Sequence, residues 1–480
     1  MTVARALCAG VLLAGPTAIA FFSGGFFDEP REVVGMGAWA LVLAAAVVSP
    51  RPFPRRWPGR LAVGALAALA GWIALSFDWA PLAGAVQDDL QRVALYLGAL
   101  IAAAALIGPR PEARWVEPAL AFGAFVVIAY GLSGRLLPDL VALAHSRSAF
   151  GRLEQPLTYW NAMGVLAAMG FVLATRVAGD ATRDLRLRLA AAAIGPPLAV
   201  GVYLSFSRGA LAALAVGLVV LAALAPGRGQ VRAIGVLLAT GVLAGAASAA
   251  LPAVRALEGG GGAKTAEGAA MLAVLVALMA TGAAAIWWLG RAEDAGRLRA
   301  DPVRLPRPRL VIAACLVVLL GATLGAAALE SKPGTPTAGA STARLASVKS
   351  NRYDYWRVAL RELRADPIRG AGSGAFRVDW LRERTVFDPA KDAHSLYVET
   401  LGELGLVGAA ILAALIVGVA VSARRAFRTA PARAAGAAAT LGVFAVHAGL
   451  DWDWEMPAVA LVAVVLAGAL VAWGDEALLE

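Results

Sequence analysis

Apolar stretches long enough to cross a membrane recur along most of the chain, and short polar segments separate them. Each runs for about 16–24 residues, close to the roughly 20 that an α-helix needs to cross the hydrocarbon core. We expect spans near 5–22, 33–49, 61–77, 93–108, 116–133, 161–175, 189–206, 209–225, 233–251, 267–290, 310–329, 405–422, 435–450 and 457–473. The pattern predicts an all-α, polytopic membrane bundle of about 12–14 transmembrane helices.

One long polar segment interrupts this alternation near the C-terminus. We expect three parts: residues 1–329 with transmembrane helices 1–11 and short loops, 330–404 as a long loop with amphipathic helices, and 405–480 with the C-terminal transmembrane helices. At the N-terminus, "MTVARALCAGVLLAGPTAIA" ends in the small residues of a signal-peptide cleavage site, but we favour an uncleaved first span. Cys8 and Cys315 lie in apolar runs and offer no plausible disulfide or metal cluster.

Composition agrees with a membrane location. The chain is 60% hydrophobic and 16% charged, whereas soluble domains have about 45–50% apolar and about 25% charged residues. The net charge of +10 could indicate nucleic acid, but no basic run is interleaved with aromatic residues. Arginine in cytoplasmic loops explains the charge, so we expect no nucleic-acid partner.

Charge in the short loops predicts the orientation. Six loops at alternate membrane crossings hold 22 Arg, whereas the short loops between them hold seven Arg and one Lys. The arginine-rich loops belong on the cytoplasmic side. Both termini are then cytoplasmic, and the long loop 330–404 is extracytoplasmic, on the outer face of the inner membrane.

Polar residues gather in four stretches on this outer side. In "GRLEQPLTYWNAMG", Arg152 is a candidate phosphate ligand, because arginine pairs bidentately with phosphate oxygens. Tyr159 and Asn161 supply support in the same stretch, although an interfacial aromatic belt with an Asn helix cap explains them equally well. In "YLSFSRGALAAL", Arg208 stands between two spans, as either an anion ligand at a helix N-terminus or a snorkelling side chain.

The long loop contains a predicted amphipathic helix over 350–366. Tyr353, Trp356, Leu360 and Leu363 recur at helical spacing and form its expected apolar face. We expect its arginines to be solvated, except Arg352. A turn-rich segment follows, in which Gly370, Gly372 and Gly374 are a weak phosphate-cradle signal.

The stretch "DAHSLYVETLGELGLVG" leads from the long loop into the next span and carries His394, one of three histidines in the chain. We expect Asp392 to be an N-cap and His394 to lie in the first helical turn, where the helix dipole favours a neutral ring. A neutral imidazole is suited to act as a general base. The alternative is a histidine that packs at a loop–membrane junction.

Asp451 and Asp453 in "HAGLDWDWEMPA" have a D-x-D spacing that invites a metal interpretation. Solvated acids beside an interfacial tryptophan belt are the alternative, and we expect no metal. No charged residue falls near the middle of a predicted span. This argues against an ion-coupled transporter.

In their order, spacing and common outer placement, these motifs resemble the O-antigen ligase and polymerase superfamily of bacterial membrane glycosyltransferases. The resemblance covers roughly residues 140–460 and rests on "GRLEQPLTYWNAMG", "LSFSRGAL", "RYDYWRVALRELRADPIRGAGSGAF", "AHSLYVETLGELGLVG" and, more weakly, "HAGLDWDWEMP". It implies transfer of a glycan from an undecaprenyl-diphosphate carrier to a hydroxyl acceptor at the outer face, with no cofactor.

The resemblance also implies residue roles. His394 would assist the acceptor hydroxyl, Arg152, Arg208 and Arg352 would hold the diphosphate, and Tyr159, Asn161 and Asp451 would support them. The implied partners are a lipid-linked glycan donor, a glycan, lipid or protein acceptor, and membrane lipid. Alternatives are a polysaccharide polymerase or a protein O-oligosaccharyltransferase of the same superfamily. From other classes, a flippase of lipid-linked glycans and a non-catalytic scaffold stay open.

Overall fold

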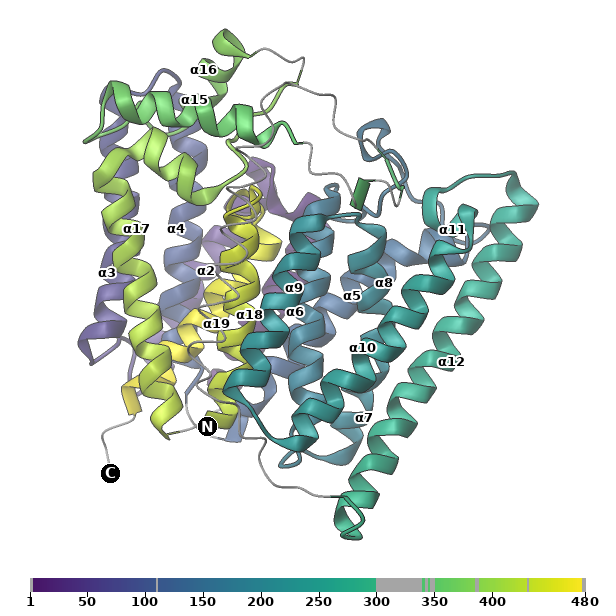
Figure 1. The fold of residues 1–480 in the computed structure, drawn as a ribbon. Coiled ribbons are helices and arrows are strands. Elements are labelled where there is room, and N and C mark those ends of the chain that lie inside the picture. The colour runs from purple at the N-terminus through teal and green to yellow at the C-terminus, as the bar shows by residue number, and fades with distance from the viewer. Residues whose placement is uncertain are drawn as a thin grey trace.

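The chain folds into a bundle of long helices with a smaller helical layer across one end (Figure 1). The structure is a computed structural model, and it describes residues 3–108, 111–298, 339–341, 344–345, 350–384, 388–429 and 431–476. The predicted all-α polytopic fold is confirmed, and eleven described helices are long and apolar enough to cross a membrane. The protein is therefore a multi-pass membrane protein.

The first half of the bundle contains α1 (Val3–Ala20), α2 (Asp28–Val48), α3 (Trp57–Leu75), α4 (Ala83–Leu106), α5 (Val116–Leu136), α6 (Trp160–Gly179), α7 (Leu185–Ala193) and α8 (Gly195–Leu204). The second half contains α9 (Arg208–Leu224), α10 (Arg228–Ala249), α11 (Pro252–Ala256), α12 (Gly261–Asp294), α17 (Leu396–Thr429), α18 (Pro431–Ala448) and α19 (Pro457–Glu476). The end layer contains α15 (Arg352–Ala365) and α16 (Phe376–Glu383).

Thirteen of the fourteen predicted spans coincide with described helices, and the predicted span 310–329 lies outside the described residues. The largest difference in a boundary is at α4, which begins at Ala83, ten residues before the predicted start. Asp88, Asp89 and Arg92 therefore belong to a membrane helix rather than to a loop. They pair with other charged groups, which is why an apolar-run criterion missed this part of the helix.

Small residues let the central helices pack closely. Within the described chain, α6 is buried from Asn161 to Gly179 and α19 almost entirely, and both helices are rich in alanine and glycine. A Cβ on Gly201 of α8 would lie 2.7 Å from a methyl group of Ile128, and one on Gly418 of α17 would lie 2.7 Å from the backbone of Ala62. Such contacts are typical of helix packing in lipid, where close backbone approach replaces the hydrophobic driving force.

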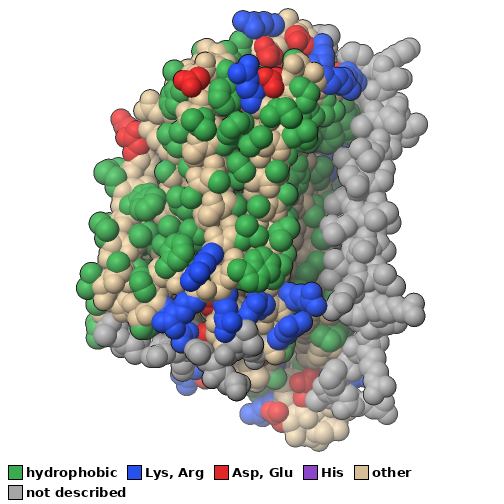
Figure 2. Space-filling model, turned by 90° about the vertical axis from the view of Figure 1, so that its left-hand side faces the viewer, with side chains coloured by type: hydrophobic (Ala, Val, Ile, Leu, Met, Phe, Trp, Pro, Cys, Tyr) green, Lys and Arg blue, Asp and Glu red, His purple; other side chains and the backbone are tan. Residues whose placement is uncertain are grey.

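The two ends of the bundle differ in the segments and residues that lie there. The first and last described residues lie at one end, and α15 and α16 cover the other (Figure 1). On the face shown in Figure 2, lysine and arginine side chains gather below a broad apolar belt, towards the end that holds the termini. We name the end covered by α15 and α16 the outer end, because all the predicted site residues lie there.

The amphipathic helix predicted over 350–366 is present as α15, but its buried face was predicted wrongly. Tyr355, Val358 and Ala359 pack with Phe376 and Trp380 of α16 in a small separate core, whereas the predicted apolar residues are only half-buried. The buried face of α15 thus packs against α16 and α17 rather than against lipid. Its residues are displaced by about one position from the predicted apolar face.

Candidate active site at the outer end

The loops that carry the predicted site residues adopt unusual backbone conformations. Phe150, Thr158, Phe206 and His394 have φ values of +48°, +63°, +49° and +55°. A non-glycine residue in this left-handed region is disfavoured and persists only where the surroundings enforce it. Each of the four lies in, or directly before, a segment singled out by the sequence.

Asp451 is the centre of the site. It is 1% exposed, and its two carboxylate oxygens accept from the Tyr159 hydroxyl at 2.7 Å and the Asn161 amide at 2.6 Å. Arg352 of α15 donates to the same oxygen as Asn161 and forms an ion pair with it. The structure thus brings together four of the seven predicted site residues. Asn161 is not the cap of α6; it lies inside the helix and points to Asp451.

The charges at this centre are strongly coupled. Burial alone would raise the pKa of the Asp451 carboxyl, but Arg352 and the nearby histidines hold it below its usual value. Burial and then the Asp451 carboxylate raise the pKa of Tyr159 well above its usual value. Asp451 is therefore ionised, Tyr159 keeps its proton, and Arg352 is fixed at the rim with 23% of its side chain exposed.

Arginines accumulate around this centre. Burial, and then the charges of Arg208 and Arg352, lower the pKa of Arg344. Burial, and then the charge of Arg344, lowers the pKa of Arg152 to about 9. Four guanidinium groups are close enough to influence one another, which makes this cluster suited to a multiply charged anion.

The four arginines are not equivalent. Arg152 is 4% exposed, donates to the backbone carbonyls of Ala149 and Ser148 at 2.7 and 2.8 Å, and lies 3.5 Å above the ring of Trp160. Much of its guanidinium therefore stabilises its own loop. Arg208, in contrast, is the first residue of α9 and is half-buried.

His394 lies before helix α17 rather than in its first turn, so the predicted Asp392 cap is wrong. The helix begins at Leu396, and the Ser395 hydroxyl accepts from the amide of Val398 at 3.4 Å. The ring Nδ1 of His394 lies 2.9 Å from the carbonyl oxygen of Asp392. Because that oxygen can only accept, Nδ1 carries the proton, and in the neutral ring Nε2 keeps its lone pair.

Aromatic rings frame His394 without enclosing it. Its ring centroid lies 5.0 Å from that of Tyr355 and 6.3 Å from that of Trp452, and the side chain is half-buried. Asp451 is close enough for the histidine to contribute to its pKa. The arrangement places a ring nitrogen capable of accepting a proton beside the arginine cluster.

The two carboxylates of the D-x-D sequence point to different partners. Asp451 binds the tyrosine, the amide and Arg352, whereas Asp453 binds Nδ1 of His447. They are not arranged as a shared pair of metal ligands. Likewise, the amides of Gly372 and Gly374 donate to the backbone oxygen and carboxylate of Glu403, so the glycine-rich turn does not present them to a phosphate.

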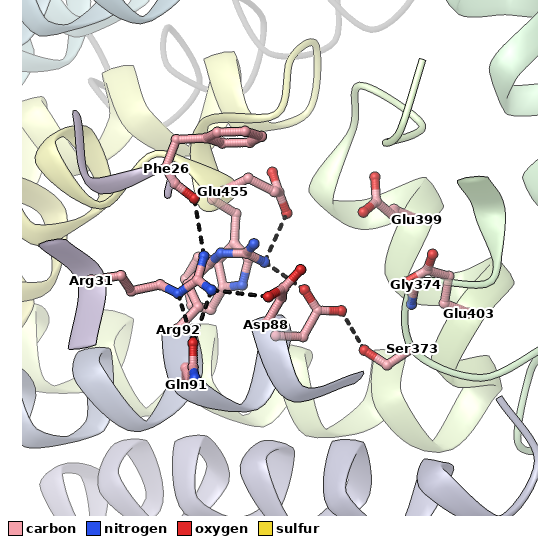
Figure 3. A network of polar contacts seen from close by, with 12 residues as sticks. Phe26, Arg31, Asp88, Gln91, Arg92, Ser373, Gly374, Glu399, Glu403 and Glu455 are labelled. Atoms are coloured by element: carbon pink, nitrogen blue, oxygen red, sulfur yellow. Dashed lines mark hydrogen bonds and ion pairs between the residues drawn. The ribbon is translucent and has the colours of Figure 1, made fainter. Parts of the chain in front are cut away.

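A second polar cluster lies at the same end and is dominated by carboxylates (Figure 3). Arg92 pairs with Asp89 at 2.6 Å and with Glu455 at 3.9 Å, and Arg31 pairs with Asp88 at 3.1 Å. Carboxylate oxygens of Asp392, Glu399 and Glu455 lie within 4.8 Å of one another, as a divalent cation would require. Glu399 also accepts from the amide of Ala393 at 2.7 Å, which ties this cluster to the His394 loop.

This acidic cluster predicts a pH-dependent stability. Burial raises the pKa of Glu455 to about 8, with Arg92 opposing it and Asp392 and Asp89 adding to it. The folded state then binds more protons than the unfolded state between pH 4.5 and about 8. Stability should fall as the pH rises through this window, by at most about 1.4 kcal/mol per pH unit for this group. Thermal unfolding in detergent from pH 5 to 9 measures this, and Glu455→Gln should flatten the curve; an unchanged slope would contradict the assignment.

A long apolar cavity opens near the site. Its volume is about 880 Å³, and α17, α18 and α19 supply most of its lining. The lining extends from Leu396, Tyr397 and Trp454 at the outer end to Arg424 and Phe427 near the opposite end of α17. Leu396 is two residues after His394, so the cavity ends beside the candidate base.

Sequence reasoning assigned no role in the site to Arg344, Ser207 or His447. No local sequence pattern distinguishes Arg344 from the other arginines of the long loop. The rarity of histidine was a usable signal for His447, because His394 was singled out on that ground. Ser207 could have been found as an N-cap directly before the first residue of a span.

The comparisons with known proteins agree with this geometry. No curated protein matches the chain significantly. A family model described as O-antigen ligase matches residues 263–413, a range that includes Arg344, Arg352 and His394. Such a family implies a glycosyl-transferring enzyme that uses a lipid-linked glycan donor and an acceptor. Over residues 263–413 the chain is therefore similar to the O-antigen ligase family, which supports its membership of that family.

Proposed function

We propose that the protein transfers a glycan from an undecaprenyl-diphosphate carrier to a hydroxyl acceptor at the outer face of the inner membrane. The observation that carries this proposal is the convergence of arginines on Asp451 beside His394, at the outer end of the apolar cavity. In this proposal both termini are cytoplasmic, which agrees with their position at the end opposite the site.

The reaction needs a proton acceptor and a site that stabilises negative charge. The acceptor oxygen attacks the anomeric carbon of the donor sugar, the bond from that carbon to the phosphate oxygen breaks, and the acceptor proton passes to Nε2 of His394. The diphosphate leaves on the lipid with the bonding electrons. Arg208, Arg344 and Arg352 stabilise the negative charge that gathers on it, and they do so in a partly dehydrated site, where fixed donors are most effective.

The apolar cavity suits the polyprenyl tail of such a donor. Its lining is almost wholly aliphatic and aromatic, and it runs along most of α17. A lipid lying in it would bring its diphosphate to the outer end, next to the arginines. Tail binding far from the reacting bond supplies affinity that positions the headgroup.

The proposal is tested by glycan transfer with the purified protein in nanodiscs. The assay supplies a polyprenyl-diphosphate-linked glycan and candidate hydroxyl acceptors, and it measures release of the lipid diphosphate. EDTA should leave the rate unchanged, since no metal is proposed. Donor consumption without a glycosylated acceptor, or movement of the intact donor across the bilayer, would contradict transfer.

Filling the cavity should weaken long-chain donors selectively. Gly442 of α18 lines the cavity, and a Cβ there would meet its nearest atom, in Val220, only at 3.9 Å. Gly442→Leu should therefore fold and should raise the KM for an undecaprenyl donor by about tenfold, as expected for losing contacts worth about 1.4 kcal/mol. A donor with a much shorter polyprenyl chain should be affected little. Gly235→Leu in α10, where a Cβ meets no atom within 4 Å, is the control; equal effects on both donors would exclude the cavity as the tail site.

A further inference from the structure

A buried chain of three side chains connects the C-terminal loop to the start of α9. Nδ1 of His447 is hydrogen-bonded to Asp453, and Nε2 lies 3.3 Å from the Ser207 hydroxyl. His447 is 0%, Asp453 1% and Ser207 4% exposed. Nothing in the glycan-transfer step proposed above uses these residues.

Ser207 is the N-cap of α9. Its hydroxyl accepts from the amide of Ala210 at 3.2 Å, and Arg208 is the next residue. A cap side chain fixes the direction in which the first turn of a helix leaves the preceding loop. The direction of Arg208 therefore depends on Ser207, which His447 holds from α18.

The contact persists in either protonation state of the histidine. In the neutral ring, Nδ1–H donates to the Asp453 carboxylate and Nε2 accepts from the Ser207 hydroxyl. In the imidazolium, Nε2–H donates to the same oxygen. Either way, the hydroxyl keeps a lone pair for the Ala210 amide, so the cap and the histidine do not compete.

Close packing leaves little freedom for this arrangement to relax. A Cβ on Gly209 would lie 3.1 Å from both Cδ2 and Nε2 of His447, so the ring lies directly against the first turn of α9. The same short loop uses Asp451 to hold Arg352. Asp451 of this loop thus holds Arg352 directly, and Asp453 contacts Ser207, the residue before Arg208, through His447.

We propose that His447, oriented by Asp453, is a positioning residue that holds the Ser207 cap and thereby directs Arg208 at the donor diphosphate. This rests on the proposed function. A displacement of about 1 Å of such a group can cost on the order of 10²-fold in rate. His447→Ala should therefore weaken binding of the lipid diphosphate and reduce kcat/KM for the donor by about that factor, while the KM for the acceptor stays the same.

The test measures binding of undecaprenyl diphosphate to nanodisc-embedded protein, with transfer assayed in parallel. His447→Gln keeps a group that can reach Ser207 and should bind much more tightly than His447→Ala. Ser207→Thr preserves the cap and should bind much more tightly than Ser207→Ala. If His447 acts through Arg208, then His447→Ala should cost little more once Arg208→Ala is present. Ser248→Ala is the matched control, because Ser248 is fully buried and donates only to Gly245 of its own helix.

The outcomes separate the two proposals. Failure of the wild type to bind the lipid diphosphate overturns the proposed function and this inference with it. Binding by the wild type with unaltered affinity in His447→Ala overturns the inference alone. The inference is also overturned if the losses of affinity from His447→Ala and Arg208→Ala multiply fully in the double variant. It is overturned as well if His447→Gln binds as weakly as His447→Ala and Ser207→Thr as weakly as Ser207→Ala. Either pattern indicates a general packing defect. If His447→Ala does not fold, the same binding measurement on His447→Gln and Ser207→Ala decides the question: weaker binding of the lipid diphosphate by Ser207→Ala than by His447→Gln supports the inference, and wild-type affinity in Ser207→Ala overturns it.

Discussion

Replacing His394 by alanine is expected to lower kcat for glycan transfer by about 10²–10⁴-fold at neutral pH, which is the usual contribution of a positioned general base. The reason is geometric. The carbonyl of Asp392 fixes the proton on Nδ1, which leaves Nε2 as the nitrogen that can accept a proton. Proton acceptance contributes only as the acceptor oxygen attacks, so the KM for the donor should change little. Initial rates over a range of donor concentrations measure both quantities.

Two further variants make the His394 prediction specific. His394→Gln keeps a polar side chain of similar reach but cannot take up a proton, so it should be as slow as alanine. His145→Ala removes another histidine of the outer end, one that is exposed, and should leave the rate unchanged. Near-normal turnover in His394→Gln would show that the residue packs or binds rather than accepting a proton.

The membrane helices were predictable because each depends only on its own sequence. A run of apolar residues reports a span without reference to its neighbours. The method fails where a helix carries charges that other segments neutralise. Arg92 and Asp89 in α4 look like loop residues until the ion pairs with each other and with Glu455 are known.

The candidate site was only partly predictable, for a related reason. Arg152, Arg208, Arg352 and His394 stand out as polar groups at the ends of spans, but the contacts among site residues join positions far apart in sequence. Tyr159 and Asp451 are 292 residues apart, and Ser207 and His447 are 240 apart. No local pattern states that Asp451 would pair with Arg352 while Asp453 turned to His447.

Removing the charge of Asp451 is expected to have the largest effect on stability. In Asp451→Asn, the amide nitrogen must take the place of one carboxylate oxygen, and each of those oxygens faces a group that can only donate: the backbone amide of Trp452, beside the Tyr159 hydroxyl, on one side, and Asn161 and Arg352 on the other. A donor is then forced against a donor, and the buried ion pair with Arg352 is lost. Breaking such a pair costs about 3–5 kcal/mol; we expect about 3, because part of Arg352 is exposed to solvent.

The same substitution should reduce transfer even at temperatures where the protein stays folded, because Arg352 loses the partner that fixes it at the rim. Thermal unfolding in one detergent, followed by transfer assays below the lower midpoint, separates the two effects. Asp366→Asn is the control: Asp366 also pairs with an arginine, Arg369, but its side chain is 34% and that of Arg369 55% exposed, so the unfolding midpoint of this variant should not move. Solvent and salt screen an exposed ion pair, whereas the groups of a buried pair have no substitute partner. Equal thermal unfolding midpoints for Asp451→Asn and Asp366→Asn would therefore mean that Asp451 does not organise the site.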